Sequence, residues 1–271
     1  PEARVGEEPV LLSHRDGGVL TLTLNRPHRR NAIDGALWEA LRAAFVDARD
    51  DTSVRALVLT GAAGAFCAGA DLGSQPDGHP LTRMHRVNDV ALALHEIAVP
   101  TVAKVTGVAV GAGWNLALGC DLVVATPEAR FSQIFAKRGL SLDFGGSWLL
   151  PRLVGMQQAK RLALLAEMIS AEEARDLGLV TWLVEPDEVD AFVDDVAARL
   201  AAGPPIALAE TKALLESGSS STMREALTAE ARAQTINRGT DAPAAFRAFV
   251  DRAEPEFTGT WVANGKARRD A

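Results

Sequence analysis

Two turns decide how this chain folds: Ala65-Phe66-Cys67-Ala68-Gly69-Ala70-Asp71-Leu72 and, further along, Val110-Gly111-Ala112-Gly113-Trp114-Asn115. Each turn follows an apolar, β-branched run and leads into a helical pattern. Small residues let a backbone approach a ligand closely, and amides at a helix N-terminus carry partial positive charge. Two such turns that face each other would offer two N–H donors to one oxygen, which is the arrangement of an oxyanion hole. The sequence therefore predicts an enzyme.

Strand and helix patterns alternate on both sides of these turns. A hairpin is predicted across Asp16-Gly17-Gly18, and Asp34 is placed to cap a helix that carries Leu37, Leu41 and Phe45 at helical spacing. The predicted elements of this half are strands over residues 10–13, 19–25, 55–60, 101–110 and 121–125, and helices over residues 81–98 and 112–119. This β-β-α cadence repeats without clear identity between the repeats, which indicates a repeated architecture in an α/β fold.

The second half of the chain is almost entirely helical in pattern. Ser170-Ala171-Glu172-Glu173 reads as a capping box, and a last short strand is predicted over residues 180–185. Helices are then predicted over residues 187–202, 205–217, 222–237 and 243–252. We expect an α/β core over residues 1–202 and a C-terminal helical region over residues 203–271.

Composition narrows the function classes. The chain has 271 residues, 48% of them hydrophobic, and a net charge of −7, which disfavours a broad nucleic-acid surface because that surface would need a basic patch. Two cysteines fit a reducing compartment better than a disulfide scaffold, and Cys67 is expected to be a packed, inert thiol. The first residues have no apolar run of the secretory kind, and no stretch approaches the ~20 apolar residues of a membrane span. We expect a cytoplasmic protein.

The motifs together resemble the crotonase (enoyl-CoA hydratase/isomerase) superfamily, and are most similar to its phenylacetyl-CoA epoxide isomerase and enoyl-CoA isomerase types. The resemblance covers residues 20–257 and rests on the order and spacing of the two turns and of four further pieces. These are Leu24-Asn25-Arg26-Pro27 with Asn31-Ala32-Ile33, the stretch from Val108 to Asp121 around the second turn, Gly145-Gly146-Ser147-Trp148-Leu149-Leu150-Pro151-Arg152 with Gly155, and Phe257-Thr258-Gly259.

The resemblance implies a spiral of ββα units with a C-terminal helical region that trimerises, as a homotrimer or as a hexamer built from two trimers. It implies an acyl-CoA substrate of the kind met in fatty acid metabolism, with no metal and no cofactor beyond the coenzyme A thioester itself. The shared chemistry is stabilisation of a thioester enolate, and the resemblance places its two donors at the backbone amides of Ala70 and Ala112.

The acid or base is where this sequence departs from the hydratase pattern. Hydratases of the family use two glutamates, and this chain has Asn115 and Phe135 at the aligned places, neither of which exchanges protons at neutral pH. Asp143 remains, and family members with an aspartate here include isomerases. Apolar neighbours would raise the pKa of Asp143 toward a useful range, although Asp143 could also cap the helix that begins near Gly145.

Substrate contacts are also expected from the resemblance. Arg26, Arg29 and Arg252 are candidates for the CoA phosphates, with Arg252 able to reach a neighbouring subunit. The backbone over Ala68, Gly69, Asp71 and Leu72 is expected to meet the adenine end, while Trp114 and Phe135 are candidates for the acyl pocket. The loop over residues 74–81 is expected to border the acyl site.

Three functions stay open on the sequence alone. The favoured one is double-bond or ring isomerisation with a single aspartate base, because one base can move a proton between two carbons whereas hydration also requires an activated water. The alternatives are an enoyl-CoA hydratase (a lyase) with a rearranged site, and a non-catalytic acyl-CoA-binding protein. We expect neither a nucleic-acid nor a membrane partner.

Overall fold

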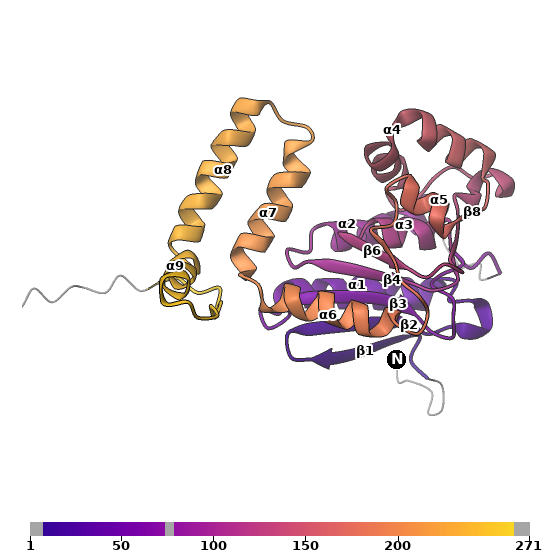
Figure 1. Ribbon diagram of the computed structural model, residues 1–271. Coiled ribbons are helices and arrows are strands. Elements are labelled where there is room, and N and C mark those ends of the chain that lie inside the picture. The colour runs from indigo at the N-terminus through magenta and orange to yellow at the C-terminus, as the bar shows by residue number, and fades with distance from the viewer. Residues whose placement is uncertain (1–7, 74–78, 263–271) are drawn as a thin grey trace, which may run out of the picture. The chain divides into compact units, whose positions relative to one another are not determined.

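The computed structural model describes residues 8–73 and 79–262, and Figure 1 shows its helices and strands. The chain divides into two compact units, one that ends at Ala198 and one that begins at Arg199. Most of the loop expected to border the acyl site, residues 74–78, lies outside the described residues. In the described ranges, no helix is both long and apolar enough to cross a membrane.

The first unit is built on a six-stranded sheet. Its strands, in spatial order, are β1 (Leu11–Asp16), β2 (Val19–Leu24), β3 (Ala56–Gly61), β4 (Thr101–Val105), β6 (Leu122–Ala125) and β9 (Trp182–Leu183). The predicted hairpin is confirmed: β1 and β2 pair antiparallel with Asp16 opposite Val19, and every other pair in this sheet is parallel. Four of the six residues of β3 are Leu, Val or Ala, as expected for a strand buried on both faces.

A second sheet contains β5 (Val108–Val110), β7 (Arg130–Ser132) and β8 (Ile169–Ser170). The prediction of one strand over residues 101–110 is therefore wrong, because the chain leaves the first sheet after β4 and enters the second at β5. The break includes Gly107, whose φ of +64° is a left-handed conformation that favours glycine. A Cβ there would lie 2.2 Å from the carbonyl oxygen of Gly64, so only glycine fits.

Helices cover this framework (Figure 1). They are α1 (Gly35–Asp50), α2 (Pro80–His95), α3 (Ala112–Leu118), α4 (Gly146–Leu165) and α5 (Ala171–Asp176), with short 3-10 turns η1 (Pro27–Arg29) and η2 (Ile134–Arg138). The predicted cap of α1 is confirmed, since the Asp34 side chain accepts a hydrogen bond from the Leu37 amide at 2.9 Å. Leu37, Leu41 and Phe45 are all fully buried, as their spacing predicts.

The capping box predicted at α5 is only half formed. The Ser170 side chain accepts a hydrogen bond from the Glu173 amide at 3.2 Å, as expected of an N-cap. The Glu173 carboxylate does not reach back; it pairs with Arg161 of α4 at 2.6 Å. An ion pair with a neighbouring helix thus replaces the local contact that the motif indicates.

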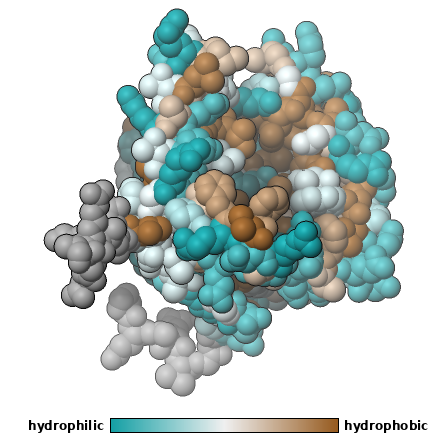
Figure 2. Space-filling model, turned by 60° about the vertical axis from the view of Figure 1, so that its left-hand side comes forward, coloured by the Kyte–Doolittle hydropathy of each residue, from teal (hydrophilic) through white to brown (hydrophobic). Residues whose placement is uncertain are grey.

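The boundary between the units falls within α6 (Val189–Ala202), and the second unit continues with α7 (Pro205–Gly218), α8 (Met223–Arg238) and α9 (Ala242–Asp251). Helices α7 and α8 lie side by side (Figure 1), and Thr222 and Glu225 form a complete capping box at the start of α8. Several large apolar side chains of these helices are exposed, and Figure 2 shows hydrophobic side chains at the surface among hydrophilic ones.

Candidate active site

The two turns singled out by the sequence are joined to each other. Cys67 and Ala109 form a parallel bridge, in which the Cys67 amide donates to the Val108 carbonyl oxygen at 2.9 Å. The Val110 amide donates to the Cys67 carbonyl oxygen at the same distance. The backbones of the two turns are therefore hydrogen-bonded to each other.

Glycines let the turns come this close. A Cβ on Gly69, which has a φ of +90°, would lie 2.7 Å from the Val110 carbonyl oxygen and 3.8 Å from the Ala112 nitrogen. A Cβ on Gly113 would lie 2.7 Å from the Cys67 Cβ and Sγ atoms. The separations of 2.7 Å are too short for any Cβ, so at these two positions the turns are in direct contact.

The amides of Ala70 and Ala112 are available for a ligand. Ile33 bonds to the residues on either side of Ala70, donating to the Gly69 carbonyl and accepting from the Asp71 amide, so the Ala70 N–H points to the opposite side. Ala112 is the first residue of α3, where amides have no partner within the helix. Within the described residues, neither N–H donates a hydrogen bond.

A buried amide pair holds the Asp143 loop against α3. The Asn115 Nδ2 donates to the Asp143 carbonyl oxygen at 2.9 Å, and the Gln133 Nε2 donates to the Asn115 Oδ1 at 2.8 Å. Gly146 packs directly on Asn115, because a Cβ there would lie 2.5 Å from Nδ2. Asn115 thus holds the loop that carries Asp143 against α3.

The Asp143 carboxyl group is desolvated and incompletely bonded. Its Oδ1 is buried and has no hydrogen-bond partner in the described part of the chain. Burial raises the pKa of this carboxyl to about 6, because the charged form loses its hydration. The alternative that Asp143 caps the next helix is wrong: the N-cap of α4 is Gly145, and no side chain caps that end.

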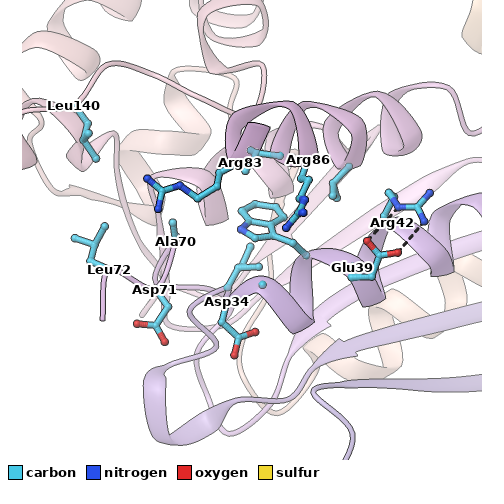
Figure 3. Close-up of a pocket in the computed structure, with 14 residues that line it drawn as sticks. Asp34, Glu39, Arg42, Ala70, Asp71, Leu72, Arg83, Arg86 and Leu140 are labelled. Carbon is cyan, nitrogen blue, oxygen red and sulfur yellow. Dashed lines mark hydrogen bonds and ion pairs between the residues drawn. The ribbon is translucent and has the colours of Figure 1, made fainter. Parts of the chain in front are cut away.

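Two cavities adjoin this region. The first, of about 630 Å³, lies against Ala70 and between α1 and α2 (Figure 3); it is lined by Ile33, Asp34, Gly35, Trp38, Glu39, Arg42, Ala70, Asp71, Leu72, Arg83, Arg86, Val87, Val90 and Leu140. The second, of about 310 Å³, is lined by Ala91, Leu92, His95, Gly119, Phe144, Gly145, Trp148 and Leu149. In the sequence, Asp143 falls between Leu140, which lines the first cavity, and Phe144, which lines the second, and it is not among the lining residues of either.

Arg26 is engaged inside the protein rather than presented to solvent. This buried side chain places Nη2 at 3.0 Å from carboxylate oxygens of both Asp34 and Asp71, and Nη1 donates to the Ala32 carbonyl. Burial opposes ionisation of Asp71, yet hydrogen bonds from Arg26 and the Gly73 amide hold its pKa below the usual value. Arg26 therefore joins two segments of the site, and its expected contact with a CoA phosphate stays a prediction.

The other candidate side chains lie in differing surroundings. Arg29 is exposed at the end of η1, and Arg252 follows α9 in the second unit with a φ of +55°. Trp114 is fully buried and packs on Phe131 with ring centroids 5.4 Å apart. Phe135 is buried beside Gly111, with its ring 3.6 Å from the position of a Cβ there. Neither aromatic ring lines a described cavity, so their contact with an acyl group stays a prediction.

The remaining expected contacts lie on the segment that leads from Ala68 to Leu72. Ala68 is half-buried and Gly69 buried, whereas Ala70 and Leu72 are exposed at the first cavity. This exposed edge is the part of the backbone that a ligand could reach. In the described ranges, no three His, Cys, Asp or Glu side chains are grouped as metal ligands.

Sequence reasoning missed Trp38 and Gln133. Trp38 lines the first cavity and stacks on Phe144, and Gln133 completes the amide pair below Asp143. Trp38 directly follows a core position of α1, which was the available signal that it borders the core. Nothing local to Gln133 indicates its partner, which lies on another element.

Comparison with known proteins identifies the family. Residues 14–260 match the family described as "Enoyl-CoA hydratase/isomerase". The chain belongs to this family. Its members share the mixed α/β fold found here, and an enoyl-CoA hydratase from Mycobacterium smegmatis superposes with a TM-score of 0.86 at 36% identity, covering 92% of this chain and 99% of that one.

Two relatives in the enoyl-CoA hydratase/isomerase family carry different activities in their names. The 1,2-epoxyphenylacetyl-CoA isomerase of Escherichia coli K12 is 37% identical over 259 residues, which cover 92% of this chain and 98% of the relative. The 2,3-dehydroadipyl-CoA hydratase of the same strain is 34% identical over 251 residues, with the same coverage of each chain. The family assignment makes this chain an acyl-CoA enzyme, and the names do not choose between isomerase and hydratase.

Proposed function

We propose that this protein is an acyl-CoA isomerase that moves a double bond with Asp143 as its only proton carrier. The observation that carries the proposal is the Asp143 carboxyl: it is desolvated, its Oδ1 has no partner among the described residues, and its pKa is raised to about 6. A base with a pKa near the working pH is well matched to taking a proton and returning it.

The proposed reaction begins with the thioester carbonyl oxygen accepting hydrogen bonds from the Ala70 and Ala112 amides. The Asp143 carboxylate takes a proton from the α-carbon of a 3-enoyl thioester, and the electron pair of that C–H bond moves into the carbonyl to give a dienolate. The two amides stabilise the negative charge on its oxygen; losing one such donor costs about 3–4 kcal/mol in comparable enzymes. The now neutral Asp143 returns the proton to the γ-carbon, which leaves a 2-enoyl thioester and regenerates the carboxylate.

Hydration is disfavoured by the residues around the site. Adding water requires a second group that positions and activates it, and Asn115 and Phe135 stand where the family's hydratases have glutamates. The Asn115 Oδ1 accepts a hydrogen bond from the Gln133 Nε2, and the Asn115 Nδ2 donates to the Asp143 carbonyl oxygen. Asn115 therefore positions the loop, and because its side chain is an amide it cannot serve as the second acid or base.

The proposal is tested by proton exchange and double-bond migration in D₂O with 3-enoyl- and 2-enoyl-CoA thioesters. We expect the wild type to exchange and migrate, and Asp143→Asn to lose roughly 10²–10⁴-fold in rate, the usual contribution of a general base. Binding of a saturated acyl-CoA should change less than threefold. Asp176→Asn, which alters an exposed ion pair on α5, serves as the control.

Three outcomes would contradict the proposal. Exchange at the wild-type rate in Asp143→Asn would place the base elsewhere. A 3-hydroxyacyl product would make the enzyme a hydratase. Tight binding of acyl-CoA with no exchange in any variant would favour the non-catalytic reading.

A further inference from the structure

The two cavities share a wall made of two aromatic rings. Trp38 of α1 lines the first cavity and Phe144 lines the second. Their rings stack at a centroid distance of 5.5 Å and an interplanar angle of 25°. On α2, the consecutive residues Val90 and Ala91 line the first and second cavity, respectively, so the cavities adjoin along a second edge as well.

Phe144 is held in this wall at a conformational cost. Its φ of +47° lies in the left-handed region, which bulky residues rarely adopt, and its side chain is only 2% exposed. Two contacts hold the segment in place: the stack on Trp38, and the hydrogen bond from Asn115 to the carbonyl of the preceding residue, Asp143. The backbone turn that presents the Asp143 carboxyl therefore also fixes the ring that closes the first cavity.

The cavity beyond the wall is suited to hydrocarbon. Its side chains are aliphatic or aromatic, and His95 is its one titratable side chain in the described part of the chain. That imidazole meets the Trp148 ring edge-on at 5.2 Å. The Arg152 guanidinium lies 4.0 Å from the centroid of the same ring, so Trp148 is fixed between two neighbours.

We infer that the Trp38–Phe144 pair limits the length of the acyl group, so that the enzyme takes short or compact acyl groups and excludes long straight chains. The inference rests on the proposed function in one respect: the thioester carbonyl lies at the Ala70 amide, and because Ala70 lines the first cavity we take that cavity to receive the acyl group. An acyl chain that grows from the thioester meets the stacked rings, and the apolar cavity behind them stays out of reach. Removing either ring joins the two cavities.

Calorimetric binding of saturated acyl-CoA thioesters of increasing length tests this inference. In the wild type, affinity should rise with each methylene and then level off when the chain reaches the rings. In Phe144→Ala, it should keep rising beyond that length by roughly fourfold per methylene, the effect of burying one more CH₂ group. Trp38→Ala should give the same length profile. It provides the test if Phe144→Ala, which removes a deeply buried side chain, does not fold.

Two further variants test whether longer chains bind because the wall between the cavities is open or because the protein has become less tightly packed. Leu92→Ala enlarges the second cavity without touching the rings, and should keep the wild-type length profile. Adding Leu149→Trp to Phe144→Ala refills the second cavity and should restore the levelling-off. The inference is overturned if the wild type gains affinity steadily through long chains, or if both ring variants level off at the wild-type length. Saturated thioesters have no double bond to move or to hydrate and are not consumed, so these binding results do not depend on whether Asp143 is the base.

Discussion

At the scale of single residues, the Asp143 carboxyl opposes folding at the pH where it works. Its pKa is about 6 in the folded chain and 3.8 in an ordinary setting, so the folded state binds this proton more tightly than the unfolded state. The folded state therefore loses stability as pH rises from about 4 to about 6, and does not regain it above. A shift of about two units corresponds to at most about 3 kcal/mol.

Replacing Asp143 by Asn should remove this penalty. We expect Asp143→Asn to be more stable than the wild type at pH 7 by up to about 3 kcal/mol, with a difference that shrinks toward zero near pH 4. Urea unfolding at several pH values measures it. Equal stability of the two proteins at pH 7 would mean that the carboxylate is well solvated, and would remove the physical basis for a raised pKa.

The same pKa sets the pH dependence of catalysis. The base form of Asp143 falls about tenfold per pH unit below pH 6, so the rate of α-proton exchange by the free enzyme should fall with it and level off above pH 7. Exchange rates at low thioester concentration across pH 4.5–8 give this profile. An inflection near pH 4 would instead point to an exposed carboxylate as the base.

At the scale of elements, the contact between the two turns depends on glycine at particular places. Gly69→Ala should separate the turns, because its Cβ would lie 2.7 Å from the Val110 carbonyl oxygen. Gly64→Ala is a matched control, since Gly64 also has a positive φ, +73°, but a Cβ there meets nothing within 4 Å. Both variants should lose about 1 kcal/mol of stability from backbone strain, as alanine does at positive φ, and Gly69→Ala should lose more because of the clash.

Only Gly69→Ala should also lose activity. Moving one oxyanion donor out of place is expected to lower kcat by roughly 10²–10³-fold, whereas Gly64→Ala should keep kcat within about threefold. Circular dichroism and exchange kinetics on both variants distinguish the two effects. A similar loss of kcat in both would mean that strain alone, not the contact between the turns, is what matters.

Elements that depend on local signals could be predicted from the sequence, and those that depend on distant contacts could not. The cap at Asp34 and the core positions Leu37, Leu41 and Phe45 follow from nearest neighbours on one helix. The break at Gly107 is set by Gly64, which is distant in the chain, so the pattern of residues 101–110 still reads as one strand. The stack of Trp38 on Phe144 and the bond from Gln133 to Asn115 join separate elements, and no spacing in the sequence reports them.

At the scale of the whole molecule, the family resemblance and the exposed apolar side chains of the second unit lead us to propose a homotrimer, alone or paired into a hexamer. Large apolar side chains exposed on α7, α8 and α9 are Leu215, Met223, Leu227, Phe246, Phe249 and Val250. Large apolar side chains exposed in this number on one unit favour a protein–protein contact that would cover them.

Sedimentation equilibrium tests the proposed assembly. We expect three or six chains per particle in the wild type, and dissociation in Phe249→Glu, which places a charge at a position that is 86% exposed in the single chain. Ser219→Glu, on the exposed link between α7 and α8, is the control for added charge. A monomeric wild type at micromolar concentration would refute the assembly.

The burial of Cys67 makes the rate at which its thiol can be labelled a measure of how often the site opens. Its thiol lies fully buried where the two turns meet, donates to the Asn31 carbonyl at 3.1 Å, and has its pKa raised to about 12 by burial. An alkylating dye attacks only a solvent-accessible thiolate, so labelling of Cys67 has to wait until the two turns separate. In a Cys120→Ala background, the labelling half-time would therefore report how often the oxyanion region comes apart, and a thioester that bridges both amides would lengthen it.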